Sequence, residues 1–109
     1  MKTIKNAEEL GKAVESNQAL LVYFYNDSCA PCVALRPKIQ EMMDSNFSKM
    51  AVLFVNAAAF PELSASYNVF ASPTIISFFE NKEAFRVSKY VSVQDLGSKI
   101  NRYYQILFS

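Results

Sequence analysis

Continuous apolar runs along the chain predict strands that are buried on both faces. The clearest runs cover residues 20–25, 50–55 and 74–79. A turn at Asn81-Lys82 then leads to a weaker strand over residues 85–89. Three strongly apolar strands and one weaker strand are therefore expected.

Between and around these runs the apolar residues follow helical spacing. Asn6 with Glu9 resembles an N-cap and its capping-box partner, and Ser92 suits the cap of a final helix. Pro61 fits the first turn of a short helix that ends near Tyr67. The order helix, strand, helix, strand, helix, strand, strand, helix predicts a mostly parallel sheet covered on both faces, closed by an antiparallel hairpin.

Length and composition narrow the possible classes of protein. The chain has 109 residues, 51% of them apolar, so we expect one domain over residues 1–109. A net charge of +1, without a basic stripe, makes nucleic acid an unexpected partner. No apolar run is long enough for a membrane span and no signal core follows Met1, so we expect a cytoplasmic monomer without a membrane partner.

The titratable residues exclude several kinds of site. There is no His, which removes His-dependent catalysis and the commonest metal ligand. Only two Cys are present, so one chain cannot supply a closed Cys/His zinc site, and we expect no metal.

The two cysteines, Cys29 and Cys32, fall where the first buried strand gives way to a helix. A helix N-terminus stabilises a thiolate at Cys29, because its free amides and dipole favour an anion. Pro31 fits the first helical turn, and Cys32 lies within reach to resolve a mixed disulfide. A structural disulfide, two inert thiols, or a metal bridging two chains are the alternatives.

Two prolines add to this pattern. Pro37 interrupts a helical pattern and should kink the helix, because it cannot donate to the Val33 carbonyl. Pro73, in Ser72-Pro73-Thr74 before an apolar strand, is either an ordinary strand-initiating residue or a cis proline at a functional turn.

Taken together, the Cys29-Ala30-Pro31-Cys32 motif, Pro37 and the Ser72-Pro73-Thr74 segment closely resemble the thioredoxin family. The resemblance implies an α/β thioredoxin fold: a central mixed sheet of four to five strands flanked by helices on both faces. It implies Cys29 as nucleophile and Cys32 as resolving thiol.

The resemblance also implies how a substrate would bind. Pro73 would be cis and lie opposite the dithiol, with the backbone at Ser72 pairing to the substrate. Tyr25, Ala30 and Pro31 would complete the substrate-binding surface. The Cys29–Cys32 disulfide would be the only redox group, with no cofactor, and the partners would be disulfide-bearing client proteins and an upstream reductase.

Several residues depart from the family pattern. Ser28 and Ala30 replace a Trp and a Gly around the first cysteine, and the glycines of the closing hairpin are missing. Tyr23 replaces a buried Asp thought to assist proton transfer at the resolving cysteine, and Val52 stands where the accompanying Lys is expected. We expect slower exchange, water as the proton acceptor, or an unidentified substitute, and a core role for Tyr23 with its hydroxyl paired.

The leading functional hypothesis is a thiol–disulfide oxidoreductase that reduces protein disulfides. An oxidase or isomerase using the same dithiol is the first alternative, and a non-catalytic protein-binding module of the same fold is the second.

Overall fold

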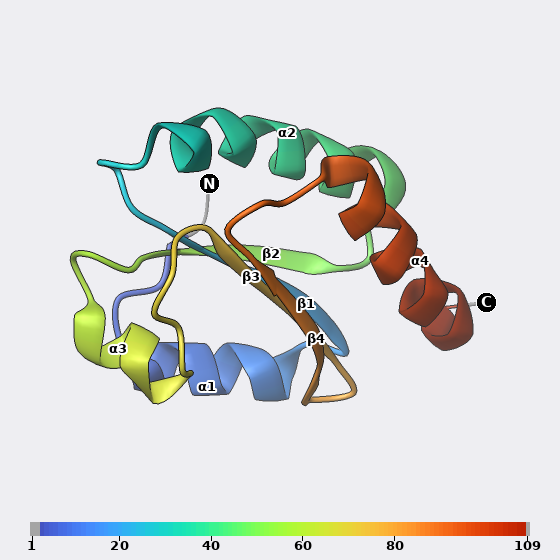
Figure 1. Ribbon diagram of the computed structural model, residues 1–109. Coiled ribbons are helices and arrows are strands. Elements are labelled where there is room, and N and C mark those ends of the chain that lie inside the picture. The colour runs from blue at the N-terminus through green and yellow to red at the C-terminus, as the bar shows by residue number, and fades with distance from the viewer. Residues whose placement is uncertain (1–2, 109) are drawn as a thin grey trace.

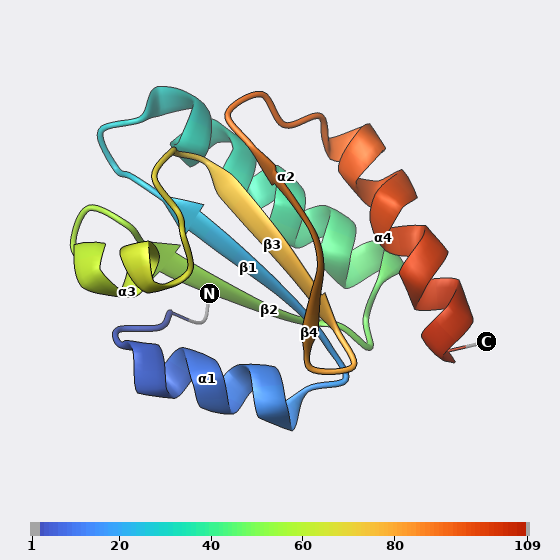
Figure 2. The ribbon, with the colours of Figure 1, turned by 60° about the horizontal axis from the view of Figure 1, so that its bottom comes forward.

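The apolar runs assemble into one mixed sheet with helices on both of its faces (Figures 1 and 2). The computed structural model describes residues 3–108 of the chain. Its elements are α1 (Ala7–Ser16), β1 (Ala19–Tyr25), α2 (Ala30–Asn46), β2 (Ala51–Asn56), α3 (Pro61–Ser66), β3 (Thr74–Phe79), β4 (Lys82–Ser88) and α4 (Val93–Phe108). The helices α1 and α3 cover one face, and α2 and α4 cover the other.

The strand order is β2-β1-β3-β4, with β1 and β2 parallel and the other two neighbouring pairs antiparallel. The sheet is therefore mixed, as the family resemblance implied, and the expectation of a mostly parallel sheet from the alternation of strands and helices is wrong. The connection from β2 to β3 covers residues 57–73, which is long enough for a crossover to a parallel strand. The length of this connection therefore does not decide the direction of β3.

The closing hairpin begins earlier than its sequence pattern predicts. The strand β4 starts at Lys82, and Phe79 pairs with Lys82 across a two-residue turn, so the expected turn at Asn81-Lys82 and the strand start at residue 85 are wrong. Glu80 and Asn81 adopt φ of 54° and 67°, the left-handed conformation of a type I′ turn. Glu at the first of these positions carries no turn signal, which hid the true boundary.

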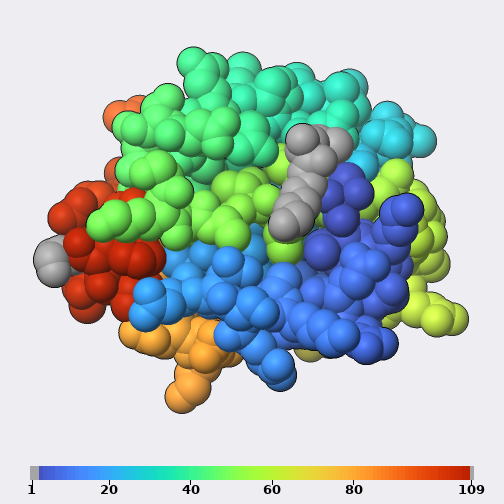
Figure 3. All heavy atoms as spheres, turned by 180° about the vertical axis from the view of Figure 1, so that it is seen from behind, coloured from blue at the N-terminus to red at the C-terminus, as the bar shows by residue number. Residues whose placement is uncertain are grey.

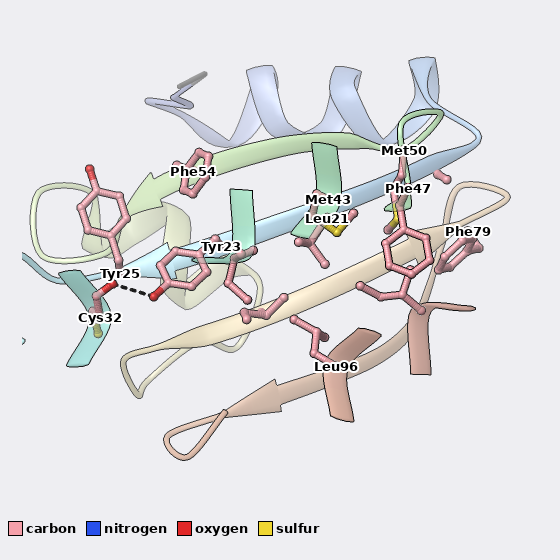
Figure 4. Packing of buried hydrophobic residues seen from close by; sticks show 14 residues of the cluster. Leu21, Tyr23, Tyr25, Cys32, Met43, Phe47, Met50, Phe54, Phe79 and Leu96 are labelled. Atoms are coloured by element: carbon pink, nitrogen blue, oxygen red, sulfur yellow. Dashed lines mark hydrogen bonds between the residues drawn. The ribbon is translucent and has the colours of Figure 1, made fainter. Parts of the chain in front are cut away.

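Alternation along β1 divides the core into two clusters. Leu21, Tyr23 and Tyr25 belong to the cluster between the sheet and α2 and α4, whereas Leu20 and Phe24 belong to the cluster on the opposite face. Figure 4 shows the first cluster, in which side chains of α2 and α4 meet the sheet.

Seen from behind, the edge strand β2 lies between α2 and α1 (Figure 3). Thr3 makes an isolated parallel bridge to Phe54 on this edge. Within residues 3–108, no helix combines the length and the apolar character needed to cross a membrane.

Candidate active site

A tight turn carries the chain from the buried strand β1 into the helix α2. The Asn26 side-chain oxygen accepts the amide of Ser28 at 2.9 Å, and the Asn26 carbonyl accepts the amide of Cys29 at 2.9 Å. These bonds are typical of an Asx turn. The helix then begins at Ala30, with Pro31 in its first turn as expected.

Cys29 is the N-cap of α2, and its sulfur is paired with the helix. The Cys29 Sγ accepts the backbone amide of Cys32 at 3.3 Å, and the Cys29 carbonyl accepts the amide of Val33 at 3.2 Å. An amide directed at a sulfur, together with the helix dipole, favours the thiolate over the thiol.

The two cysteines are joined by a disulfide, and they differ in access to solvent. Cys29 is half-buried, whereas the Cys32 side chain is 0% exposed. A large disulfide substrate can therefore approach Cys29 and not Cys32.

Beneath the dithiol lies the phenol of Tyr23. Its side chain is 0% exposed, and its hydroxyl donates to the Cys32 carbonyl at 2.8 Å (Figure 4). Burial raises the Tyr23 pKa to about 12, an effect that the charge of Arg36 partly offsets. The expectation that this hydroxyl is paired within the core is confirmed, and the phenol is neutral at physiological pH.

The residue opposite Tyr23 on the neighbouring strand is Phe54, whose ring centroid lies 5.7 Å from that of Tyr23. Val52 pairs with Leu21 instead, so the expectation that Val52 takes the place beside Tyr23 is wrong. The parallel register between β1 and β2, which no local pattern encodes, decides this pairing. Tyr23 therefore faces an aromatic neighbour and not a charged one.

The Ser72–Pro73 peptide bond is cis, as the resemblance implied. Pro73 lines a groove beside the dithiol together with Pro31 and Leu35 of α2 and with the segment after β4, which contributes Lys89, Tyr90, Val91 and Ser92. Ala30, which precedes the groove residue Pro31 in the chain, is exposed, and Ser72 is half-buried.

Tyr25 and Pro73 are buried, whereas Ala30 and Pro31 are exposed. The Tyr25 side chain is 7% exposed, and the guanidinium carbon of Arg36 lies 4.6 Å from the centre of its ring. The arrangement is that of a cation–π pair, which covers the ring from solvent.

Lys89 and Tyr90 line the groove but were not among the residues expected from the sequence. The Lys89 amide donates to the Pro73 carbonyl at 2.9 Å, and Tyr90 is 97% exposed. β4 runs antiparallel to β3, and β3 runs antiparallel to β1. The strands β4 and β1 therefore finish at the same end of the sheet. The sequence pattern did not predict the direction of β3. A correct direction for β3 would have placed the segment after β4 beside the dithiol.

No group of three or more His, Cys, Asp or Glu side chains that could hold a metal is found in the described part of the chain. The reactive group at this end of the sheet is the dithiol of Cys29 and Cys32. The fold and the site together define an α/β protein with a redox-capable cysteine pair at a helix N-terminus.

Comparison with known proteins assigns this architecture to a family. The family model for thioredoxin matches residues 2–102. The chain is 31% identical to the thioredoxin of Mycoplasmoides gallisepticum, over 88% of this chain and 95% of that protein. It is 32% identical to thioredoxin-2 of Pyricularia oryzae, over 77% of this chain but 48% of that protein, so it spans about half the length of that relative.

A solved structure gives the same result. The crystal structure of Fasciola hepatica thioredoxin superposes with a TM-score of 0.86 at 25% identity, covering 94% of this chain and 99% of that one. The chain belongs to the thioredoxin family.

Proposed function

We propose that this protein reduces disulfide bonds in client proteins by thiol–disulfide exchange. The observation that carries the proposal is the pairing of a half-buried Cys29 sulfur, at a helix N-terminus, with a fully buried Cys32. Membership of the thioredoxin family and a cysteine pair able to form a disulfide both support thiol–disulfide oxidoreductase activity.

The exchange proceeds in two displacements. The Cys29 thiolate attacks one sulfur of the client disulfide, which forms a Cys29–client disulfide and expels the other client sulfur as a thiolate. The Cys32 thiolate then attacks the Cys29 sulfur, forms the Cys29–Cys32 disulfide and releases the second client thiolate. The protons of Cys29 and Cys32 pass through solvent to the two client thiolates. The client gains two electrons and this protein loses them.

The groove beside the dithiol is the proposed seat of the client segment. Pro31 offers exposed apolar surface there, and Pro73 lines the groove from a buried position. Ser72 precedes the cis bond, and its backbone is proposed to pair with an extended client chain. Ala30 lies on the exposed side of the motif. Tyr25 is proposed to contribute only through the 7% of its surface that stays exposed beside Arg36.

An upstream reductase is the proposed source of electrons, and the disulfide itself the only redox group. We propose that residues 1–109 form a single domain, which the single sheet shared by both core clusters supports. We also propose that this domain acts as a monomer. A reducing compartment, the cytoplasm, is the proposed location, because a reductant of disulfides works where thiols are kept reduced.

Reduction of insulin, with dithiothreitol as the electron source, tests the reaction and the two roles. The wild-type protein should accelerate the reduction of insulin. In Cys29→Ser the rate should fall to that with dithiothreitol alone, because the nucleophile is gone. Cys32→Ser that has been reduced and then freed of dithiothreitol should stay covalently attached to insulin through Cys29, visible by mass spectrometry. Full activity in Cys29→Ser, or an adduct formed only by that variant, would overturn the assigned roles.

The direction of exchange is tested by the reduction potential, measured by equilibration with thiol–disulfide buffers. We expect a value near or below about −250 mV, in the range of reductants. A value between about −180 and −120 mV would instead identify an oxidase or isomerase.

A further inference from the structure

The helix α2 is weakly held at the place where it carries the dithiol. Pro37 lies inside the helix and has no amide hydrogen, so the Val33 carbonyl lacks the donor that the helical ladder normally supplies. The first turn, which contains both Cys29 and Cys32, is therefore less firmly joined to the rest of α2.

The phenol of Tyr23 meets the helix next to this gap. Its hydroxyl donates at 2.8 Å to the carbonyl of Cys32, the residue directly before Val33. A carbonyl oxygen has two lone pairs, so it can accept this bond in addition to its helical one. The strand β1 thereby holds the turn that the helix itself holds poorly.

One peptide group connects the phenol to both cysteines. The carbonyl of this group belongs to Cys32 and accepts from Tyr23, and its amide belongs to Val33 and donates to the Cys29 carbonyl at 3.2 Å. Hydrogen bonds in series polarise one another, so the bond to Tyr23 strengthens the bond to Cys29.

The surroundings keep this donor in a single orientation. The Tyr23 ring packs against Phe54, with 5.7 Å between centroids, and against Tyr25, with 6.4 Å between centroids. Both Tyr23 and the Cys32 side chain are 0% exposed. Of the charged residues, Arg36 acts on the phenol and lowers its pKa, but the larger effect of burial keeps the hydroxyl protonated and a donor at physiological pH.

We propose that Tyr23 is a positioning residue for the resolving step: its hydroxyl holds the Cys32 peptide so that the Cys32 sulfur attacks the Cys29 mixed disulfide in line. The proposal rests on the exchange reaction proposed above. It assigns a role to a donor that is protonated at physiological pH, at the position where the resembled family carries a buried Asp.

The two displacements can be followed separately with the aromatic disulfide dithiobis(nitrobenzoate). Attack by Cys29 expels the first coloured thionitrobenzoate, and attack by Cys32 on the Cys29 sulfur breaks the mixed disulfide and expels the second. In Tyr23→Phe we expect the first phase to keep its rate. The second phase should slow by about three- to tenfold, the equivalent of one neutral hydrogen bond.

Tyr67→Phe is the matched control, because Tyr67 is a half-buried tyrosine that packs in the cluster on the opposite face of the sheet. Both phases should keep their wild-type rates in this variant. Tyr23→Phe leaves no acceptor unpaired and keeps the ring, so its melting temperature should stay within about 5 °C of the wild-type value.

The outcomes separate this inference from the proposed function. A wild-type protein without a second phase would overturn the exchange reaction itself. Two normal phases in Tyr23→Phe would overturn only the role of Tyr23. Equal slowing of both phases, or a protein that no longer folds, would mean that the hydroxyl supports the structure in general and does not position Cys32.

Discussion

Single residues show how burial changes the chemistry of a side chain in this protein. The Tyr23 phenol has its pKa raised from 10.0 to about 12, mainly because burial disfavours the charged form. Burial also raises the pKa of Tyr67. A group with a higher pKa in the folded state stabilises that state fully below its unfolded pKa, and the benefit disappears as the pH rises through the folded value.

The free energy of unfolding is therefore expected to fall between pH 10 and about 12, where an unfolded phenol has lost its proton and Tyr23 has not. One such group contributes a slope of at most about 1.4 kcal/mol per pH unit. Urea unfolding of the oxidised protein across this range measures the fall, which should be smaller in Tyr23→Phe. Tyr90→Phe, at an exposed position, should fall like the wild type. An unchanged fall in Tyr23→Phe would contradict the assigned burial cost.

At the scale of elements, the β3–β4 hairpin closes through a turn whose geometry its residues do not favour. Both Glu80 and Asn81 have positive φ, and Asn tolerates this conformation far better than Glu does. The backbone amide of Glu80 donates to the Gln18 carbonyl at 2.9 Å, which holds the turn against the start of β1. The strained residue is thus retained by contacts that lie outside the hairpin.

Replacing Glu80 by Asn should raise the free energy of unfolding by about 0.5–1 kcal/mol, because the side chain then suits the left-handed backbone. Glu80→Gln is the matched control: it removes the charge, keeps the steric strain and should leave stability nearly unchanged. Urea unfolding at neutral pH distinguishes the two variants. A similar gain in both would indicate that charge, and not backbone conformation, limits the stability of the turn.

Across the whole molecule, the two helical layers differ in how closely their helices approach their neighbours. Gly97 in α4 faces α2, and a Cβ at this position would lie 3.0 Å from the Met42 sulfur. Gly11 in α1 has no atom within 4 Å of the same hypothetical Cβ. Close packing of α4 against α2 therefore uses the absence of a side chain at Gly97, whereas Gly11 has no such role.

Gly11→Ala should raise the free energy of unfolding by about 0.5–1 kcal/mol, the usual gain for Ala over Gly inside a helix. Gly97→Ala should gain clearly less, because the Met42 side chain must move to admit the new methyl group. Thermal or urea unfolding of both variants provides the comparison. An equal gain at the two positions would mean that Met42 yields without cost.

Local patterns allowed much of the fold to be predicted. The strand β3 was expected over residues 74–79 and is found there, because a strand buried on both faces is a continuous apolar run. The position of Cys29 before a helix was predictable for the same kind of reason, since a strand end, two cysteines and Pro31 are neighbours in sequence.

Contacts between distant segments were not predictable in this way. The connection from β2 to β3 is long enough for either direction of β3, so it does not encode that direction, and the partner of Tyr23 depended on the register of two strands. The groove residues Lys89 and Tyr90 follow a strand whose start was itself misplaced. Each of these features depends on how segments far apart in the sequence pack together, and no residue pattern within one segment predicts it.

The sequence by itself determined which segments form helices and strands, which faces they bury, and that the reactive sulfur caps a helix, because hydrophobic periodicity and capping act between residues close along the chain. Only the tertiary structure decided that Pro73 and the end of β4 lie at the same end of the sheet as Cys29, and that a buried phenol donates a hydrogen bond to the Cys32 carbonyl. These features depend on strand order and register, which are set when the whole core packs at once.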